Sequence, residues 1–145
     1  QEVLELMPGR VINLHTSYLP YNRGSSPNFF SFLEDTPKGV TIHLMSAGLD
    51  EGDILCQREL HFDEEKETFA STYEALLQEI EKLFRENWQQ IREGSIIPVK
   101  QAGPVTYHRM KDLDAIREKV DFDWNMKIGD FKRAYEKAMR KDENS

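Results

Sequence analysis

The chain has 145 residues, with 19 Lys or Arg against 26 Asp or Glu and a formal net charge of -7 at pH 7. This length fits a single domain, and the negative charge argues against a protein that binds nucleic acid by neutralising phosphates. Hydrophobic residues make up 39% of the chain, which excludes a disordered protein, and no apolar run approaches the roughly 18 residues of a membrane span, so we expect neither a nucleic-acid nor a membrane partner.

The first part of the chain predicts short strands separated by helices and turns. Apolar runs between turn residues predict strands at residues 10–15, 40–45 and 54–62. A short helix is expected over residues 1–7. A second helix is expected from Pro27 to the turn at residues 36–39, with Ser26 as its N-cap.

A long helix is the strongest signal in the sequence. Apolar residues recur at the helical period from Phe69 to Ile91, and Gly94 follows where a helix commonly ends in the left-handed conformation. Beyond it, the pattern predicts an extended run at residues 96–99, a short helix near residues 112–118 and a basic amphipathic helix after Gly129.

Together these elements indicate an α/β fold. Three strands make a thin sheet for helices of this size, so we expect strands absent from this chain, or supplied by another copy, to complete it. The sequence opens at Gln1 without an initiator methionine, which leaves open whether the chain is a fragment or complete. We divide it into a core at residues 1–95 and a mostly helical C-terminal extension at residues 96–145.

Two polar residues, Asn13 and His15, lie near the end of the first predicted strand. They share one face of that strand because side chains alternate with a period of two, and ligands of open α/β sheets bind at the carboxyl ends of strands. An amide donor beside an imidazole can hold an oxyanion and move a proton. By spacing alone, a hydrogen-bonded pair that anchors the following loop fits these residues at least as well.

A second candidate is the loop at residues 48–53, where carboxylates lie between two glycines. Asp50 or Asp53 could act as a base or orient a water, and an ordinary turn capped by an Asp is the alternative. His43, in the middle of a strand, is typical of a hydrogen-bonded core residue. Scattered histidines and the single Cys56 predict no metal site and no disulfide, which fits a cytoplasmic protein.

Three blocks of sequence carry a family resemblance: PGRVINLHTSYLP at residues 8–20, GVTIH at residues 39–43 and GLDEGDIL at residues 48–55. In order and spacing they resemble the 10-formyltetrahydrofolate-dependent formyltransferases, which include glycinamide ribonucleotide, methionyl-tRNA and sugar N-formyltransferases. The resemblance implies the C-terminal half of the family's catalytic domain. That half is part of an open, mainly parallel sheet flanked by helices, followed here by a helical C-terminal extension.

The resemblance also implies a reaction, in which 10-formyltetrahydrofolate gives its formyl group to a primary amine without a metal. Asn13, His15 and Asp50 match the family's catalytic residues. Asn13 would donate to the oxyanion, His15 would stabilise the same oxygen or protonate the leaving nitrogen, and Asp50 would accept the proton of the amine. The folate is expected to touch the backbone of Ser46, Ala47, Gly48, Leu49 and Asp50, and the acceptor to contact His43, Tyr18 and Arg23.

The acceptor implied by the loop at residues 21–28 is a small amine, and we favour a nucleotide-linked amino sugar. Formyltetrahydrofolate hydrolysis, a methionyl-tRNA formyltransferase-like activity and a non-catalytic folate- or partner-binding remnant stay open as alternatives. The expected protein partner is a second copy of the chain, or a polypeptide that supplies the missing N-terminal half.

Overall fold

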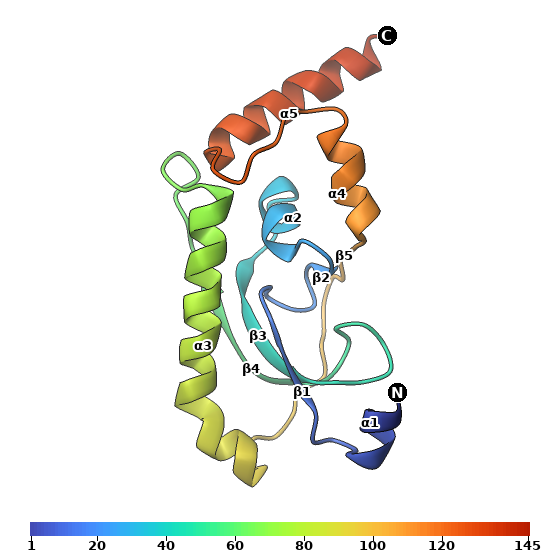
Figure 1. The fold of residues 1–145 in the computed structure, drawn as a ribbon, viewed down its shortest axis with the longest axis vertical. Coiled ribbons are helices and arrows are strands. Elements are labelled where there is room, and N and C mark those ends of the chain that lie inside the picture. The colour runs from blue at the N-terminus through green and yellow to red at the C-terminus, as the bar shows by residue number, and fades with distance from the viewer.

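A three-stranded sheet lies at the centre of the computed structural model, which describes residues 1–145 (Figure 1). The middle strand is β3 (Lys38–Leu44), with β1 (Ile12–His15) on one side and β4 (Ile54–Leu60) on the other. All three strands coincide with the apolar runs of the sequence, and the helices that surround them confirm the predicted α/β class.

The three strands pair antiparallel, where we expected mainly parallel pairing. The connection from β3 to β4 comprises only residues 45–53, whereas a parallel pair requires a crossover of about a dozen residues or more. The longer connection from β1 to β3 contains α2 (Pro27–Leu33), whose phenylalanines pack with Phe69 and Phe131 at one end of the sheet. This connection is long enough for a crossover, but its helix packs at the end of the sheet and the chain enters β3 antiparallel to β1.

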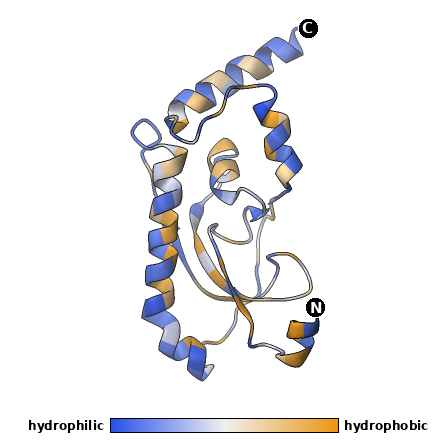
Figure 2. Ribbon diagram, in the orientation of Figure 1, coloured by the Kyte–Doolittle hydropathy of each residue, from blue (hydrophilic) through white to orange (hydrophobic).

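One face of the sheet is covered by α3 (Phe69–Glu93). Hydrophobic and hydrophilic residues alternate around the turns of α3, as its amphipathic sequence predicts (Figure 2). Its hydrophobic side packs on β3 through a cluster of five buried residues, Val40, Ile42, Leu76, Ile80 and Leu83. No helix of the molecule combines the length and hydropathy needed to cross a membrane.

The ends of α3 are defined by local interactions. At its start, Thr68 accepts a hydrogen bond from the Ser71 amide, and the Ser71 hydroxyl accepts one from the Thr68 amide. At its end, Gly94 adopts the predicted left-handed conformation with φ 68°. Ser26 occupies the predicted N-cap position of α2 with Pro27 first in the helix, but its side chain makes no capping bond, because its φ is 53° and a capping side chain needs extended backbone.

Aromatic side chains form a second core at the end of the sheet. Phe29 of α2, Phe69 of α3 and Phe131 of α5 (Ile128–Glu143) are fully buried, with ring centroids 5.3 to 5.5 Å apart. Helix α4 (Met110–Arg117) adds Leu113 to the same cluster. This core contains residues from both sides of the predicted boundary at residues 95 and 96, and that boundary stays a prediction.

Residues 99–108, which we call the return segment, lead from the end of α3 back to the loop after β1. Within it, β5 (Tyr107–His108) pairs in parallel with β2 (Arg23–Gly24). At its start, Val99 exchanges two backbone hydrogen bonds with Ile54 of β4. The sequence pattern predicts none of these pairings, and they bring the return segment beside the loop after β1. The remaining element, α1 (Glu2–Leu6), precedes β1.

Candidate active site

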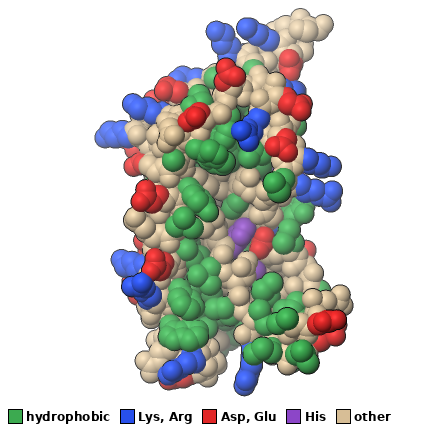
Figure 3. Space-filling view, in the orientation of Figure 1, with side chains coloured by type: hydrophobic (Ala, Val, Ile, Leu, Met, Phe, Trp, Pro, Cys, Tyr) green, Lys and Arg blue, Asp and Glu red, His purple; other side chains and the backbone are tan.

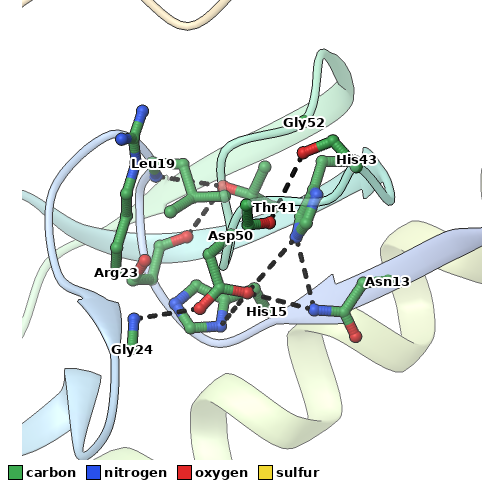
Figure 4. A network of polar contacts seen from close by, with 12 residues as sticks. Asn13, His15, Leu19, Arg23, Gly24, Thr41, His43, Asp50 and Gly52 are labelled. Atoms are coloured by element: carbon green, nitrogen blue, oxygen red, sulfur yellow. Dashed lines mark hydrogen bonds and ion pairs between the residues drawn. The ribbon is translucent and has the colours of Figure 1, made fainter. Parts of the chain in front are cut away.

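The register of β1 and β3 brings polar residues together on the sheet face opposite α3. Asn13 pairs with His43 and His15 pairs with Thr41. Paired residues on neighbouring strands point to the same face, and Val40 and Ile42 point to the other. The loop from β3 to β4 places Asp50 over Asn13, His15 and His43 (Figure 4).

The carboxylate of Asp50 is the centre of this group. Its Oδ1 lies 3.3 Å from Asn13 Nδ2, 3.6 Å from His43 Nε2 and 3.7 Å from His15 Nδ1. Its Oδ2 accepts a hydrogen bond of 2.9 Å from the Gly24 amide. One oxygen therefore faces three side chains while the backbone anchors the other.

The two imidazole rings are oriented by backbone carbonyls on their far sides. His15 Nε2 lies 2.9 Å from the carbonyl oxygen of Asn22, and His43 Nδ1 lies 2.9 Å from that of Leu44. A carbonyl can only accept, so we assign the hydrogen of each neutral ring to these nitrogens. The nitrogens that face Asp50 then carry lone pairs, and Asn13 is the only side-chain donor directed at Oδ1. The arrangement can take up one proton and share it between a ring nitrogen and the carboxylate.

Burial and charge set the protonation of the group. Burial lowers the pKa of His15, and this effect exceeds the opposing effects of the Asn22 hydrogen bond and the Asp50 charge. Burial alone would raise the pKa of Asp50. A hydrogen bond from His43 and the charge of His15, in the states where those rings carry a second proton, act with the Gly24 amide to lower it. At neutral pH the site therefore holds a carboxylate beside a neutral His15.

A hollow of about 350 Å³ opens beside these residues, and its lining includes three of them, Asn13, His43 and Asp50. The lining also includes all of the predicted folate-binding residues, Ser46, Ala47, Gly48, Leu49 and Asp50, together with Leu4 and Met45. On the face shown in Figure 3, histidine and acidic side chains meet between hydrophobic patches. The hollow is thus lined by both apolar and polar residues. Two larger hollows, of about 570 and 590 Å³, contain none of the site residues.

Two of the predicted acceptor-binding residues lie outside this contact group. Arg23 donates from Nε and Nη2 to Gln101 Oε1, at 3.2 and 2.8 Å, and its Nη1 lies 3.9 Å from Glu51. Tyr18 is half-buried in the loop after β1, and its hydroxyl makes no hydrogen bond. The third, His43, contacts both Asn13 and Asp50. Of the two carboxylates that the sequence left open, the structure brings Asp50, and not Asp53, to the histidines.

Three supporting residues were not identified from the sequence. Asn22 is fully buried and its carbonyl orients His15, Thr41 donates to the Ser17 carbonyl, and Gln101 donates to the loop that carries Asp50. Thr41 lies in the GVTIH block, but the pattern gave it no role, and its contact with Ser17 spans 24 positions. Gln101 lies 51 positions from Asp50, so no local spacing marks it. Asn22 is seven positions from His15, and its contact depends on the conformation of the loop between them.

The fold and the site define an α/β protein in which an amide, two imidazoles and one carboxylate meet beside a hollow, a set of groups that can stabilise an oxyanion and move a proton. Residues 1–87 match the Formyl transferase family, and the chain belongs to that family.

The matches to two curated relatives cover most of this chain but less than half of each relative. The chain is 34% identical over 108 residues to the dTDP-4-amino-4,6-dideoxyglucose formyltransferase of Mycobacterium bovis, covering 74% of this chain and 46% of that protein. It is 35% identical over 115 residues to a methionyl-tRNA formyltransferase of Clostridium botulinum, covering 79% of this chain and 37% of that protein. The chain thus spans less than half the length of these curated relatives.

A solved structure is similar over more of its length. The formyltransferase PseJ from Anoxybacillus kamchatkensis, in complex with UDP-4,6-dideoxy-4-formamido-L-AltNAc and tetrahydrofolate, superposes with a TM-score of 0.82 at 45% identity. The match covers 88% of this chain and 67% of that one. The formyltransferase-type fold expected from the sequence is thereby confirmed.

Proposed function

We propose that the protein transfers a formyl group from 10-formyltetrahydrofolate to the primary amine of a nucleotide-linked amino sugar. The observation that carries the proposal is the position of Asp50 Oδ1, which faces Asn13 Nδ2, His15 Nδ1 and His43 Nε2. The acceptor class is supported by PseJ, whose structure holds a formamido sugar linked to UDP together with tetrahydrofolate.

Each residue has a role that follows from its hydrogen-bonding capacity. The folate, when bound, supplies the formyl group, and the backbone of residues 46–50 would hold it. Asn13 donates to the oxygen on which negative charge develops. Asp50 would accept the proton that the amine loses, and the lone pair of His15 Nδ1, 3.7 Å away, is the next acceptor for that proton. His15 would then return the proton to the leaving nitrogen of the folate as the bond to the formyl carbon breaks, so that no net proton is gained or lost.

The acceptor side of the site needs groups that this chain supplies only in part. Arg23 is already engaged by Gln101 and Glu51, so Tyr18 is the predicted acceptor-binding residue whose polar group is free. β1 pairs with β3 on one side only. We infer that a further segment or a second chain lies beside β1 and completes the donor and acceptor pockets.

A turnover assay tests the proposal. The chain is incubated with 10-formyltetrahydrofolate and, in parallel, with UDP- and dTDP-linked amino sugars, a free amino sugar or methionyl-tRNA. Mass spectrometry detects the formylated amine, and calorimetry with 5-formyltetrahydrofolate measures folate binding separately. Formylation of a nucleotide-linked amino sugar supports the proposal. Free formate without a formylated amine would identify a hydrolase, and the absence of both turnover and folate binding would contradict a folate site in this chain.

A further inference from the structure

Gln101, in the return segment, makes four hydrogen bonds beside the candidate active site. Its Nε2 donates to the backbone carbonyls of Asp50 and Gly52, each at 2.8 Å. Its Oε1 accepts from Nε and Nη2 of Arg23. Both amide hydrogens and both lone pairs of the oxygen are used, so the partners fix the orientation of the amide.

The loop that Gln101 holds determines where the Asp50 carboxylate lies. Asp50 has φ 54°, a left-handed conformation that costs free energy for a residue with a Cβ. Bonds to the carbonyls of Asp50 and Gly52 fix the backbone on both sides of Glu51. With the backbone fixed, Oδ1 stays within 3.7 Å of the histidines and Asn13.

The rest of the return segment holds the other side of the same site. Thr106 accepts hydrogen bonds from the amides of Asn22 and Arg23, through its hydroxyl and its carbonyl respectively. These bonds place the Asn22 carbonyl that orients His15 and the Gly24 amide that binds Asp50 Oδ2. Both the histidine and the carboxylate are therefore held by residues beyond position 87, where the family match ends.

We propose that Gln101 is a positioning residue for the proton acceptor Asp50, and that it acts by donating both amide hydrogens to the Asp50 loop. The activity measurements below depend on the proposed function. The titration measurements do not.

Two substitutions of Gln101 distinguish hydrogen-bond donation to the Asp50 loop from contact with Arg23 alone. Gln101→Met keeps the size of the side chain and removes all four hydrogen bonds. Gln101→Glu keeps an acceptor for Arg23 but directs a carboxylate oxygen at two carbonyl oxygens. Gln57→Met is the matched control, because Gln57 Nε2 also bridges two acceptors, the Leu19 carbonyl and the Thr41 hydroxyl, away from the Asp50 loop.

The first measurement is an NMR titration of the Asp50 carboxyl in the 145-residue chain, with urea unfolding of every variant. We expect both Gln101 variants to raise the pKa of Asp50 toward its ordinary value, because the carboxylate loses its alignment with His43 and His15. We expect Gln57→Met to destabilise the chain comparably without changing this titration. Equal titration shifts in all three variants, or none in the Gln101 variants, would overturn the proposal.

The second measurement is formyl transfer. Gln101→Met is expected to lower kcat about 10²-fold, the scale of a 1 Å misplacement, with little change in the KM of the amine. Gln101→Glu is expected to be as harmful, which a role limited to contact with Arg23 would not produce. An active wild type with unaffected Gln101 variants would overturn the positioning role alone. An inactive wild type whose Asp50 titration still moves in those variants would overturn the proposed function and support the positioning.

Discussion

Asp50 is placed so that it can accept a proton without being neutralised in the resting site. It is 8% exposed and keeps a lowered pKa because His43, His15 and the Gly24 amide all favour its charged form. A neutral ring directs a lone pair at it, since the ring hydrogen is committed to a backbone carbonyl, whereas a protonated ring donates a hydrogen bond to it. A proton taken from an amine could therefore be shared between the carboxylate and a ring nitrogen, which is how Asp50 would serve as a general base.

Replacing Asp50 tests that role with little disturbance of the fold. In Asp50→Asn, an amide oxygen can still accept from the Gly24 amide, and Asn tolerates a positive φ as well as Asp does. Formyl transfer should fall by about 10²–10⁴-fold, the usual contribution of a general base, while the melting temperature changes little. Asp53→Asn is the control, because the side chain of Asp53 makes no hydrogen bond. Comparable losses in both variants would contradict a specific role for Asp50.

The burial of His15 predicts a pH dependence of stability. Its pKa is lowered in the folded chain, so the unfolded chain binds a proton more readily. The contribution of His15 to stability is therefore complete above its ordinary pKa of 6.5 and is lost as the pH falls toward its lower folded-state value. Wild type should lose stability more steeply than His15→Gln between pH 7.5 and about 5.

Urea unfolding at several pH values measures this difference. His61→Gln is the matched histidine control, since His61 is exposed and lies outside the site. Equal slopes for wild type and His15→Gln would mean that His15 does not titrate differently on folding.

A second loss of stability is expected from Asp50 below pH 3.8, because the pKa of this carboxyl is also lowered in the folded chain. In the same urea experiment, Asp50→Asn should lack this loss.

At the scale of elements, the loop between β3 and β4 depends on one close backbone approach. A Cβ at Gly52 would overlap the carbonyl oxygen of Leu44, which accepts the hydrogen bond from His43 Nδ1. Gly52→Ala should therefore destabilise the chain by about 1–3 kcal/mol and displace His43. The checks are urea unfolding and the NMR resonances of the His43 ring.

Gly94 provides the comparison for this substitution. It has φ 68° and no atom near the position of an added Cβ, so Gly94→Ala should cost about 1–2 kcal/mol from the left-handed backbone alone. It should leave the His43 resonances in place. If both glycine variants shifted His43 equally, the close approach at Gly52 would not be what holds that ring.

The elements also show what the sequence could and could not predict. The helical period from Phe69 to Ile91 and the glycine after it identified α3, because both are local properties. Alternation placed Asn13 and His15 on one face for the same reason. The register of β1 and β3 sets His43 opposite Asn13, and Gln101 contacts Asp50 across 51 positions of sequence. Both contacts depend on pairing between distant segments, which produces no periodic pattern in the sequence.

At the scale of the whole molecule, the aromatic core joins the predicted catalytic core to the predicted extension. Phe131 of α5 contacts Phe29 and Phe69 at 5.3 and 5.5 Å between ring centroids. The return segment adds the bonds of Gln101 and Thr106 to loops of the first half. The aromatic core and the return segment both link residues 1–95 to residues 96–145. We therefore expect the chain to unfold as one unit, although the sequence pattern changes at residues 95 and 96.

Phe131→Ala tests whether the two parts unfold together. Phe131 is fully buried, so its truncation should cost about 3–5 kcal/mol. Trp88 packs on Phe84 in α3, and Trp124 packs on Phe122 beside the aromatic core, so two single-tryptophan versions report on the two parts separately. We expect both tryptophans to shift to the same lower urea midpoint. If only Trp124 shifted and Trp88 kept the wild-type midpoint, residues 96–145 would unfold independently, and the aromatic core would be a dispensable contact instead of part of the structure that holds the site.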